Sequence, residues 1–232
     1  MDAVFFDIDD TLYDQSVPFA NAVHKVLGDV PGATDSDLYL ASRRHSAEVF
    51  EAFSRHAFPT DEMYIRRARE TMAEFGMHLT DEQALELQHA YASRNDHGTT
   101  LSPTMGRVLA LVSSRSRAGV ISNGREDRQL DKLRSLGIYE WVAPEAVFIS
   151  DVVGLAKPDP ALFRLACSRL DVSPERSVYV GDSLALDVGG SNAAGMTSVW
   201  FNRRYPAHTG EPVPDWTVTS ETDLLDLLDR LL

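Results

Sequence analysis

The chain has 232 residues, a formal net charge of −13 and a pI near 4.9. This length is sufficient for one large domain or two small ones that bury an apolar core. The acidic balance argues against nucleic acid or an anionic membrane as the main partner, and no apolar run approaches the roughly 20 residues that cross a bilayer. We therefore expect a soluble, cytoplasmic protein.

The single cysteine, Cys167, excludes an internal disulfide and a zinc site built on several thiolates. Its use is compatible with a reducing compartment, where disulfides are rare. Because Cys167 lies in an apolar, helix-like pattern over residues 162–170, we interpret it as a small core residue rather than as a nucleophile.

The first predicted element is a buried strand over residues 3–7, which runs directly into Asp7, Asp9 and Thr11. Alternation along an extended backbone places Asp7 and Asp9 on the same side of the strand end. Two acids aimed at one point raise each other's pKa unless a cation or a division of roles separates them. The pattern therefore favours one nucleophile or metal ligand and one acid or base, with an Asp-rich turn as the simpler alternative.

The next stretch, from about residue 18 to about residue 95, has helical spacing of its apolar residues and no strand-like alternation. It is therefore predicted to be an all-helical module. The expected helices are 18–28, 36–56, 60–76 and 80–95. Several arginines of these helices could meet an anionic or planar substrate, although charge on a helix surface is the interpretation that we favour. They are Arg43, Arg44, Arg66, Arg67 and Arg69.

The remainder of the chain alternates helices with short apolar strands. This alternation predicts a parallel sheet with helices covering both faces. The expected strands are 118–122, 146–149, 177–181 and 197–201. The expected helices are 104–115, 125–136, 160–170, 184–194 and 221–231. Residues 205–215, with three prolines and a glycine, are predicted to form a surface loop.

These elements combine into one architecture. Residues 3–7 are too few to fold alone, but they are a buried strand of the same kind as those after residue 117. We therefore predict a doubly wound, Rossmann-like α/β core over residues 1–16 and 100–232, interrupted by an inserted all-α domain over residues 17–99. Ligands of such sheets bind at the carboxyl ends of the strands.

A hydroxyl group and an amine are expected at this edge. Ser122 and Asn123 end a buried strand, where the hydroxyl and backbone N–H groups could hold a phosphoryl oxygen, although Ser-Asn-Gly is also good turn chemistry. Lys157 lies in a loop whose prolines restrict where its amine can point, and an ordinary exposed loop lysine is the alternative.

Asp182 and Asp187 bring two more carboxylates to the same edge. They follow the expected strand 177–181. The alternative interpretation is a helix cap at Asp182 or Ser183, with Asp187 as an ordinary acid of the first turn. Hard oxygen ligands with coordination positions left open suit Mg²⁺, which commonly shares its sphere with substrate phosphate and water. The acids therefore favour a magnesium site.

The four motifs that carry this chemistry contain Asp7, Ser122, Lys157 and Asp182. In this combination and order, the chain closely resembles the haloacid dehalogenase-like superfamily, in its phosphatase branch with a helical cap. The motifs span residues 7–187, and the whole chain fits the plan of that family. Asp10 stands where many members carry glycine. The segments 152–158 and 214–218 look most like the branch that contains pyrimidine 5′-nucleotidases.

The resemblance implies a role for each of these polar residues. Asp7 would attack phosphorus and form an aspartyl-phosphate. Asp9 would protonate the leaving oxygen and then deprotonate the attacking water. Ser122, Asn123 and Lys157 would bind the oxygens of the transferred group, and Lys157 would also neutralise Asp7.

The resemblance also implies Mg²⁺ as the cofactor. The ion would be held by the Asp7 carboxylate, the backbone carbonyl of Asp9 and the Asp182 side chain, with Asp187 bound directly or through a water molecule. The helical insert would close over this edge of the sheet, exclude water and choose the substrate.

The implied activity is Mg²⁺-dependent hydrolysis of a small phosphate monoester by a monomer or a homodimer, and a nucleoside 5′-monophosphate is the substrate that we favour. Flavin mononucleotide, phosphoglycolate and sugar phosphates are alternatives. A 2-haloacid dehalogenase would use the same nucleophile on carbon, but such members generally lack the second acid, so Asp9 weighs against it. A phosphomutase and a non-catalytic binding module stay open.

Overall fold

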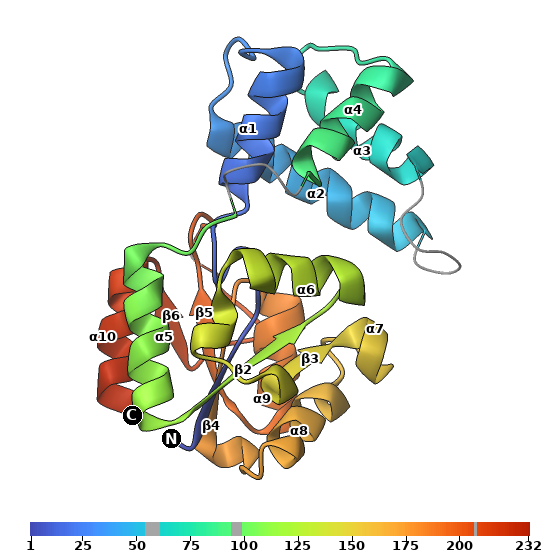
Figure 1. Ribbon diagram of the computed structural model, residues 1–232. Helices are drawn as coiled ribbons and strands as arrows, with labels where there is room; N and C mark the ends of the chain where they lie inside the picture. Colours follow the sequence, from blue (N-terminus) through green and yellow to red (C-terminus); the bar gives the residue numbers. More distant parts are fainter. Residues whose placement is uncertain (54–60, 94–98, 207) are drawn as a thin grey trace. The chain divides into compact units, whose positions relative to one another are not determined.

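The computed structural model of the protein describes residues 1–53, 61–93, 99–206 and 208–232. The chain forms two compact units (Figure 1). Met1–Asp14 and Thr100–Leu232 form one, here named the α/β unit, and Gln15–Thr99 form the other, the helical unit. The roles that the sequence suggests for them, catalytic core and cap, stay predictions.

The α/β unit is built on a six-stranded sheet in which every paired strand is parallel. Its strands are β1 (Ala3–Phe6), β2 (Arg117–Ser122), β3 (Val147–Ile149), β4 (Ser177–Gly181), β5 (Thr197–Phe201) and β6 (Trp216–Val218). The spatial order is β3-β2-β1-β4-β5-β6, so the direction of winding reverses between β1 and β4. The predicted doubly wound α/β fold is confirmed, and this reversal is where such sheets bind ligands.

Helices cover both faces of this sheet. They are α5 (Pro103–Arg115), α6 (Glu126–Ser135), α7 (Ser150–Val153), α8 (Pro160–Arg169), α9 (Gly189–Ala194) and α10 (Glu221–Leu231). Figure 1 shows α5 beside α10 against one face and α8 beside α9 against the other. Two short elements, β6 and α7, were not expected, because three or four residues are too few to show a hydrophobic period.

The expected helix 184–194 is two elements instead of one. A π-helical turn over Leu184–Val188 precedes α9. Its wider turn is seen in Val188, whose N–H reaches back five residues to the Ser183 carbonyl at 3.2 Å. Single π turns are frequent at functional sites, and this one carries Asp187.

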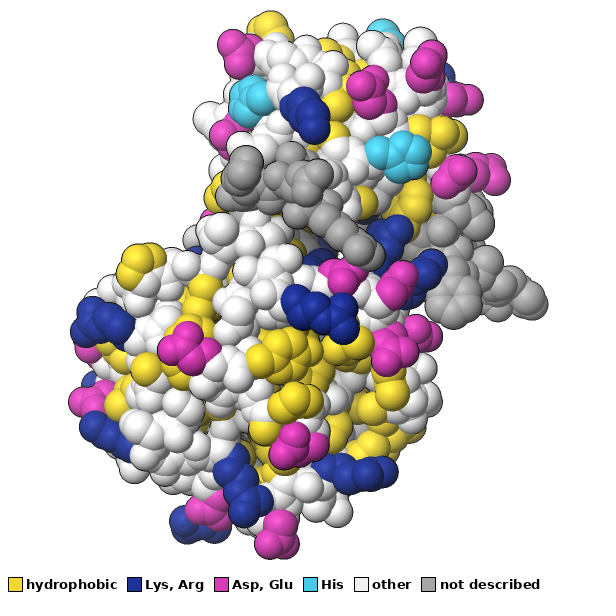
Figure 2. Space-filling model, viewed as in Figure 1, with side chains coloured by type: hydrophobic (Ala, Val, Ile, Leu, Met, Phe, Trp, Pro, Cys, Tyr) yellow, Lys and Arg dark blue, Asp and Glu magenta, His cyan; other side chains and the backbone are white. Residues whose placement is uncertain are grey.

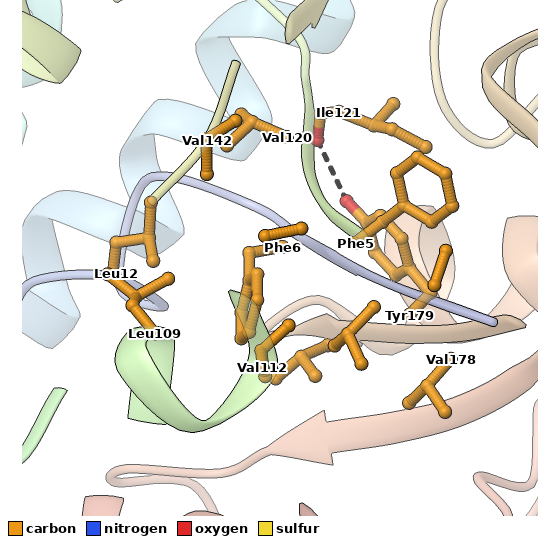
Figure 3. Packing of buried hydrophobic residues seen from close by; sticks show 14 of the residues in the cluster. Phe5, Phe6, Leu12, Leu109, Val112, Val120, Ile121, Val142, Val178 and Tyr179 are labelled. Carbon is orange, nitrogen blue, oxygen red and sulfur yellow. Dashed lines mark hydrogen bonds between the residues drawn. The ribbon is translucent and has the colours of Figure 1, made fainter. Parts of the chain in front are cut away.

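The core of the α/β unit is packed around the central strand β1. Figure 3 shows Phe6 beside Leu109 and Val112 of α5, while Phe5 points away from them. All four of these side chains are fully buried, and burial of each stabilises the fold by about 1.5–3 kcal/mol. Gly119 on β2 allows this packing, because a Cβ atom there would lie 2.6 Å from the Phe5 ring.

The helical unit has a separate apolar cluster. Its helices are α1 (Ser16–Leu27), α2 (Asp35–Phe53), α3 (Asp61–Ala73) and α4 (Asp81–Tyr91). Phe19 packs edge-on against Tyr39 and Tyr91, with ring centroids 5.8 and 5.4 Å apart. All four expected helices form, although residues 54–56, 60 and 94–95 of those expectations lie outside the described residues.

The surface of both units mixes charges of both signs. On the face shown in Figure 2, Lys and Arg side chains are interspersed with Asp and Glu. In the part of the chain that the structure describes, no helix is both long and apolar enough to cross a membrane.

Candidate active site

Three neighbouring strands end at one edge of the sheet, at the reversal of winding order. Asp7 follows β1, Ser122 ends β2, and Asp182 follows β4. The register pairs Phe6 with Val120 on one side and Val180 on the other, so these polar residues come at nearly the same height along the sheet. The predicted convergence of strand ends is therefore present.

Lys157 lies at the centre of the charged groups. Its Nζ atom donates to Oδ1 of Asp7 at 2.7 Å and to Oδ1 of Asp187 at 2.6 Å. Only 3% of the Lys157 side chain is exposed, so the alternative of an exposed loop lysine is wrong. Buried ions need partners of opposite charge, and this ammonium group is held by two carboxylates.

Burial and mutual charge shape the ionisation of these groups. Burial raises the pKa of Asp7 to about 6, the charges of Asp187 and Asp9 act in the same direction, and Lys157 opposes them. Burial by itself lowers the pKa of Lys157, but the charges of Asp187 and Asp7 outweigh it and raise this pKa well above its usual value. Lys157 is therefore a permanent positive charge beside the predicted nucleophile.

Tyr179, on β4, is a member of the site that sequence reasoning missed. Its hydroxyl donates to the Ile121 carbonyl at 2.9 Å (Figure 3), lies 3.1 Å from Oδ1 of Asp187 and accepts a hydrogen bond from Lys157 at 3.1 Å. Burial, together with the charge of Asp187, raises its pKa well above the usual value. A tyrosine inside an otherwise aliphatic buried strand is the signal that could have identified it.

Asp187 reaches this network because the backbone beside it has room. A Cβ atom at Gly181 would overlap the Asp187 carboxyl group, so a side chain at position 181 would displace it. The second Asp187 oxygen accepts a hydrogen bond from the Ser183 N–H at 2.9 Å. Glycine at 181 and the π turn thus fix the Asp187 carboxylate against Lys157.

Asp9 has different partners from Asp7. Lys132 of α6 donates to both Asp9 carboxylate oxygens, each at 2.7 Å, and Tyr13 donates to Oδ1 at 2.8 Å. About a quarter of the Asp9 side chain, 26%, is exposed, so it stays open to solvent. Lys132 was not predicted, because one lysine on a polar helix surface carries no distinguishing pattern.

Ser122 and Asn123 are held in different ways. The Gln129 side chain donates to Ser122 Oγ at 3.0 Å, so the Ser122 hydroxyl keeps its own proton to donate. The Asn123 side chain accepts from the Lys157 N–H at 2.8 Å and donates to the Lys157 carbonyl at 3.0 Å. It clamps the loop that carries Lys157, and phosphate binding by Asn123 stays a prediction.

Asp10 occupies a position where glycine is common in the superfamily that this chain resembles. Its φ angle is 59°, a left-handed conformation that costs a non-glycine residue roughly 1–2 kcal/mol. Arg204 offsets this strain by donating to Asp10 Oδ1 at 2.8 Å and by a second bond to Asp14. Arg203 holds the backbone, donating to the carbonyl oxygens of Asp10 and Thr11 at 3.0 Å.

The acids at this edge fit a divalent metal ion. Asp7, Asp182 and Asp187 each offer one carboxylate oxygen, and these three oxygens lie within 4.8 Å of one another. All three residues are buried, and Lys157 contributes a single positive charge to the cluster. Hard carboxylate oxygens are the ligands that Mg²⁺ prefers. The structure thus brings together Asp7, Lys157, Asp182 and Asp187, while Asp9 turns to Lys132.

The comparisons with known sequences agree with this geometry. The haloacid dehalogenase-like hydrolase family matches residues 1–195. A glyceraldehyde 3-phosphate phosphatase from Methanothermobacter thermautotrophicus is 32% identical over 205 residues, which cover 86% of this chain and 85% of the relative. A phosphoserine phosphatase from Thermus thermophilus is 31% identical over 246 residues, covering 94% and 95%. A pyrimidine 5′-nucleotidase from Streptococcus pneumoniae is 24% identical over 232 residues, covering 98% and 94%.

A solved structure shares the fold. The HAD-hydrolase YfnB from Bacillus subtilis, crystallised with bound magnesium, superposes with a TM-score of 0.74 at 21% identity and covers 98% of each chain. At this identity the likeness supports the fold alone. The family match and the relatives show more: the chain belongs to the haloacid dehalogenase-like hydrolases, and the prediction of a phosphatase of this superfamily is confirmed.

Proposed function

We propose that this protein hydrolyses small phosphate monoesters through an aspartyl-phosphate on Asp7. The observation that carries the proposal is the buried contact of Lys157 with Asp7 and Asp187. A permanently charged lysine beside a carboxylate at the edge of a parallel sheet offsets the repulsion between that carboxylate and an incoming phosphate dianion.

The first chemical step transfers the phosphoryl group to the enzyme. An oxygen of Asp7 forms a bond to phosphorus while the bond from phosphorus to the ester oxygen breaks, and Asp9 supplies the proton that this oxygen needs. Ser122 donates its hydroxyl proton to an oxygen of the transferred group, a role that the bond from Gln129 supports.

The second step returns the enzyme to its starting state. Asp9, now ionised, takes a proton from water, the water oxygen bonds to phosphorus, and the bond to Asp7 breaks to release inorganic phosphate. Asp7, Asp182 and Asp187 would hold a magnesium ion, with the Asp9 carbonyl as a further ligand. When bound, such an ion supplies positive charge that neutralises phosphate and orients it.

The roles of the two acids are tested with Asp9→Asn and p-nitrophenyl phosphate. Nitrophenolate leaves readily without a proton, so this variant should still phosphorylate Asp7, whereas hydrolysis of the intermediate slows because no base activates water. Stopped-flow should show a burst approaching one nitrophenolate per site, and mass spectrometry after acid quench should find phosphate on Asp7. Phosphate on another residue, or halide release from 2-haloacids by the unmutated protein, would contradict the proposal.

The metal is tested separately. Chelation should abolish hydrolysis, and Mg²⁺ or Mn²⁺ should restore it. Ca²⁺ should not, because its larger and looser coordination sphere misplaces nucleophile and phosphate. Isothermal titration of Mg²⁺ into the unmutated protein and into Asp182→Asn gives a readout that does not depend on turnover. Full turnover in chelator would contradict the metal assignment.

For the substrate, we propose a nucleoside 5′-monophosphate, with pyrimidine nucleotides favoured. The likeness of segments 152–158 and 214–218 to the nucleotidase branch supports this choice, and one of the relatives is named a pyrimidine 5′-nucleotidase. Other relatives are named for glyceraldehyde 3-phosphate and phosphoserine. The test is to measure kcat/KM for a panel of substrates that contains nucleoside monophosphates, these two esters, flavin mononucleotide, phosphoglycolate and sugar phosphates. If any of these exceeds every nucleotide by more than about tenfold, a gap of about 1.4 kcal/mol, the nucleotide assignment is wrong.

A further inference from the structure

Asp7 and Asp9 each pair with a different lysine. Lys157 contacts Asp7 from the loop before α8 and is fully enclosed. Lys132 contacts Asp9 from the last turn of α6, with 28% of its side chain exposed. Two carboxylates two residues apart need separate cations or separate roles, and this division supplies one cation for each.

Lys132 is committed to Asp9. Its Nζ donates to Oδ1 and Oδ2, both at 2.7 Å, and among the described residues it has no other acceptor. With the Tyr13 hydroxyl on Oδ1, the Asp9 carboxylate is held at both oxygens. A carboxyl group held in this way cannot rotate freely about its side-chain bonds, and a fixed orientation is what effective proton transfer requires.

The helix that carries Lys132 also supports the phosphate side of the site. Gln129 lies one turn earlier on α6 and donates to Ser122 Oγ, and residues three apart lie on the same helix face. The α6 helix therefore presents one polar side chain to Ser122 and another to Asp9. By contrast, Arg134 on the same helix pairs with Asp131 at the surface.

We propose that Lys132 is a positioning residue for Asp9, holding its carboxylate where it serves the leaving oxygen and then the attacking water. This role rests on the proposed function of Asp9. Because Lys132 acts through Asp9, its loss should slow only the steps in which Asp9 transfers a proton. It should slow phosphorylation by alkyl esters, whose leaving group needs a proton, and leave phosphorylation by p-nitrophenyl phosphate nearly unchanged.

The test is rapid-quench measurement of phosphate on Asp7 in Lys132→Met, with p-nitrophenyl phosphate and with the alkyl phosphate that the unmutated protein turns over fastest. Phosphorylation by the alkyl ester should fall about 10- to 100-fold, and that by the aryl ester less than twofold. Steady-state turnover of both should fall, since hydrolysis of the intermediate also uses Asp9. Lys132→Arg, which keeps charge and donors, should recover most of the loss.

Two controls complete the experiment. Arg134→Met removes a neighbouring surface cation of the same helix and should change neither rate, and thermal unfolding shows whether Lys132→Met is folded. In an Asp9→Asn background, adding Lys132→Met should change phosphorylation by less than twofold, because the group that Lys132 positions is already disabled.

The outcomes separate the two hypotheses. If the unmutated protein forms no phosphate adduct on Asp7, the proposed function fails and the role of Lys132 fails with it. If the adduct forms but Lys132→Met equals the unmutated protein, only the role of Lys132 is overturned. Equal losses with alkyl and aryl esters, or full additivity with Asp9→Asn, would also overturn it, because Lys132 would then act on the phosphate rather than through Asp9.

Discussion

The two units of this protein differ in where charged side chains pair. The α/β unit has surface ion pairs, as between Arg125 and Asp127, but it also buries charged side chains in contact with one another, as Lys157 is between Asp7 and Asp187. Among the described residues of the helical unit, most ion pairs lie at the surface, as Arg44 does with Glu74 and Arg69 with Asp81. Buried pairs are expensive to break, whereas surface pairs contribute about 0–1 kcal/mol each.

This difference shows that the buried charges of the α/β unit are better explained by function than by stability. A buried ammonium beside several carboxylates has little advantage over apolar packing as a source of stability, so its presence at a strand end indicates a function. Charge on the outside of a helical bundle needs no such explanation. Substitutions in the two units should therefore have effects of different size.

The largest effect is expected from Asp7→Asn. A neutral amide is a poor nucleophile and the covalent step has no substitute, so turnover of every ester should fall by more than about 10⁴-fold. The variant keeps the shape of the side chain, and circular dichroism should show an intact fold. If kcat/KM fell for some esters only, Asp7 would be selecting substrates rather than attacking phosphorus.

Lys157→Met should produce the largest loss of stability. It leaves Asp7 and Asp187 buried without their cation, and breaking a buried pair in this way costs about 3–5 kcal/mol. Urea unfolding at pH 8 in chelator measures the loss. The loss should be smaller at pH 5, below the Asp7 pKa of about 6, because protonation of Asp7 removes one of the two stranded charges. It should also shrink when Asp187→Asn is added. An unchanged midpoint at both pH values would contradict the buried pairing.

The elements of the active site were predictable to the extent that they depend on local pattern. Asp7 and Asp182 follow buried apolar strands, and parallel strands bring their carboxyl ends to one edge, so their convergence follows from the sequence pattern. The helical insert was predictable because its apolar residues keep a helical spacing over a long stretch without strand-like alternation. Both features depend only on residues that are close together in the sequence.

The remaining parts of the site depend on side chains that meet across the fold. Lys132 and Asp9 are 123 residues apart, and no local pattern distinguishes Lys132 from the other charges of α6. Tyr179 had only a weak sequence signal, its hydroxyl in an otherwise aliphatic buried strand, because an aromatic residue there is also expected for packing alone. The left-handed backbone of Asp10 was equally invisible, since its stabilising partner Arg204 lies far along the chain.

Arg67 differs from the neighbouring arginines of the helical unit, because it has no carboxylate partner among the described residues. Its neighbours on α3, Arg66 and Arg69, pair with carboxylates. Arg67 instead donates to the Gln88 side chain and lies 5.6 Å from the Tyr64 ring centroid, and no carboxylate pairs with it among the described residues. Burial lowers its pKa, which means that its charge is poorly compensated.

Arg67→Met should therefore change the free energy of unfolding by less than about 1 kcal/mol, because removal of a half-buried charge without a carboxylate partner offsets the lost bond to Gln88. The same change from cation to methionine at Lys157 should lower the free energy of unfolding several times more, because it leaves two buried carboxylates without their cation. Arg69→Met is the matched surface control. A loss above about 3 kcal/mol at Arg67 would mean that this arginine is as well compensated as Lys157.

The smallest effect is expected from His24, at the surface of the helical unit. Its ring lies 2.8 Å from Asp35 and 3.3 Å from Asp29. The hydrogen bond to Asp35 raises the pKa of His24 above its ordinary value of 6.5 despite slight burial, and the charges of both acids act in the same direction.

A raised pKa in the folded state means that the protonated form stabilises the fold. This contribution is fully present below about pH 6.5 and is lost as the pH rises through the higher folded value. His24→Gln should therefore lower the free energy of unfolding at pH 5.5 by no more than about 1 kcal/mol and leave it unchanged at pH 8.5. Added salt should weaken the difference, since the pair is exposed. A difference that grew with rising pH would show that the neutral ring, rather than the charged one, stabilises this corner of the helical unit.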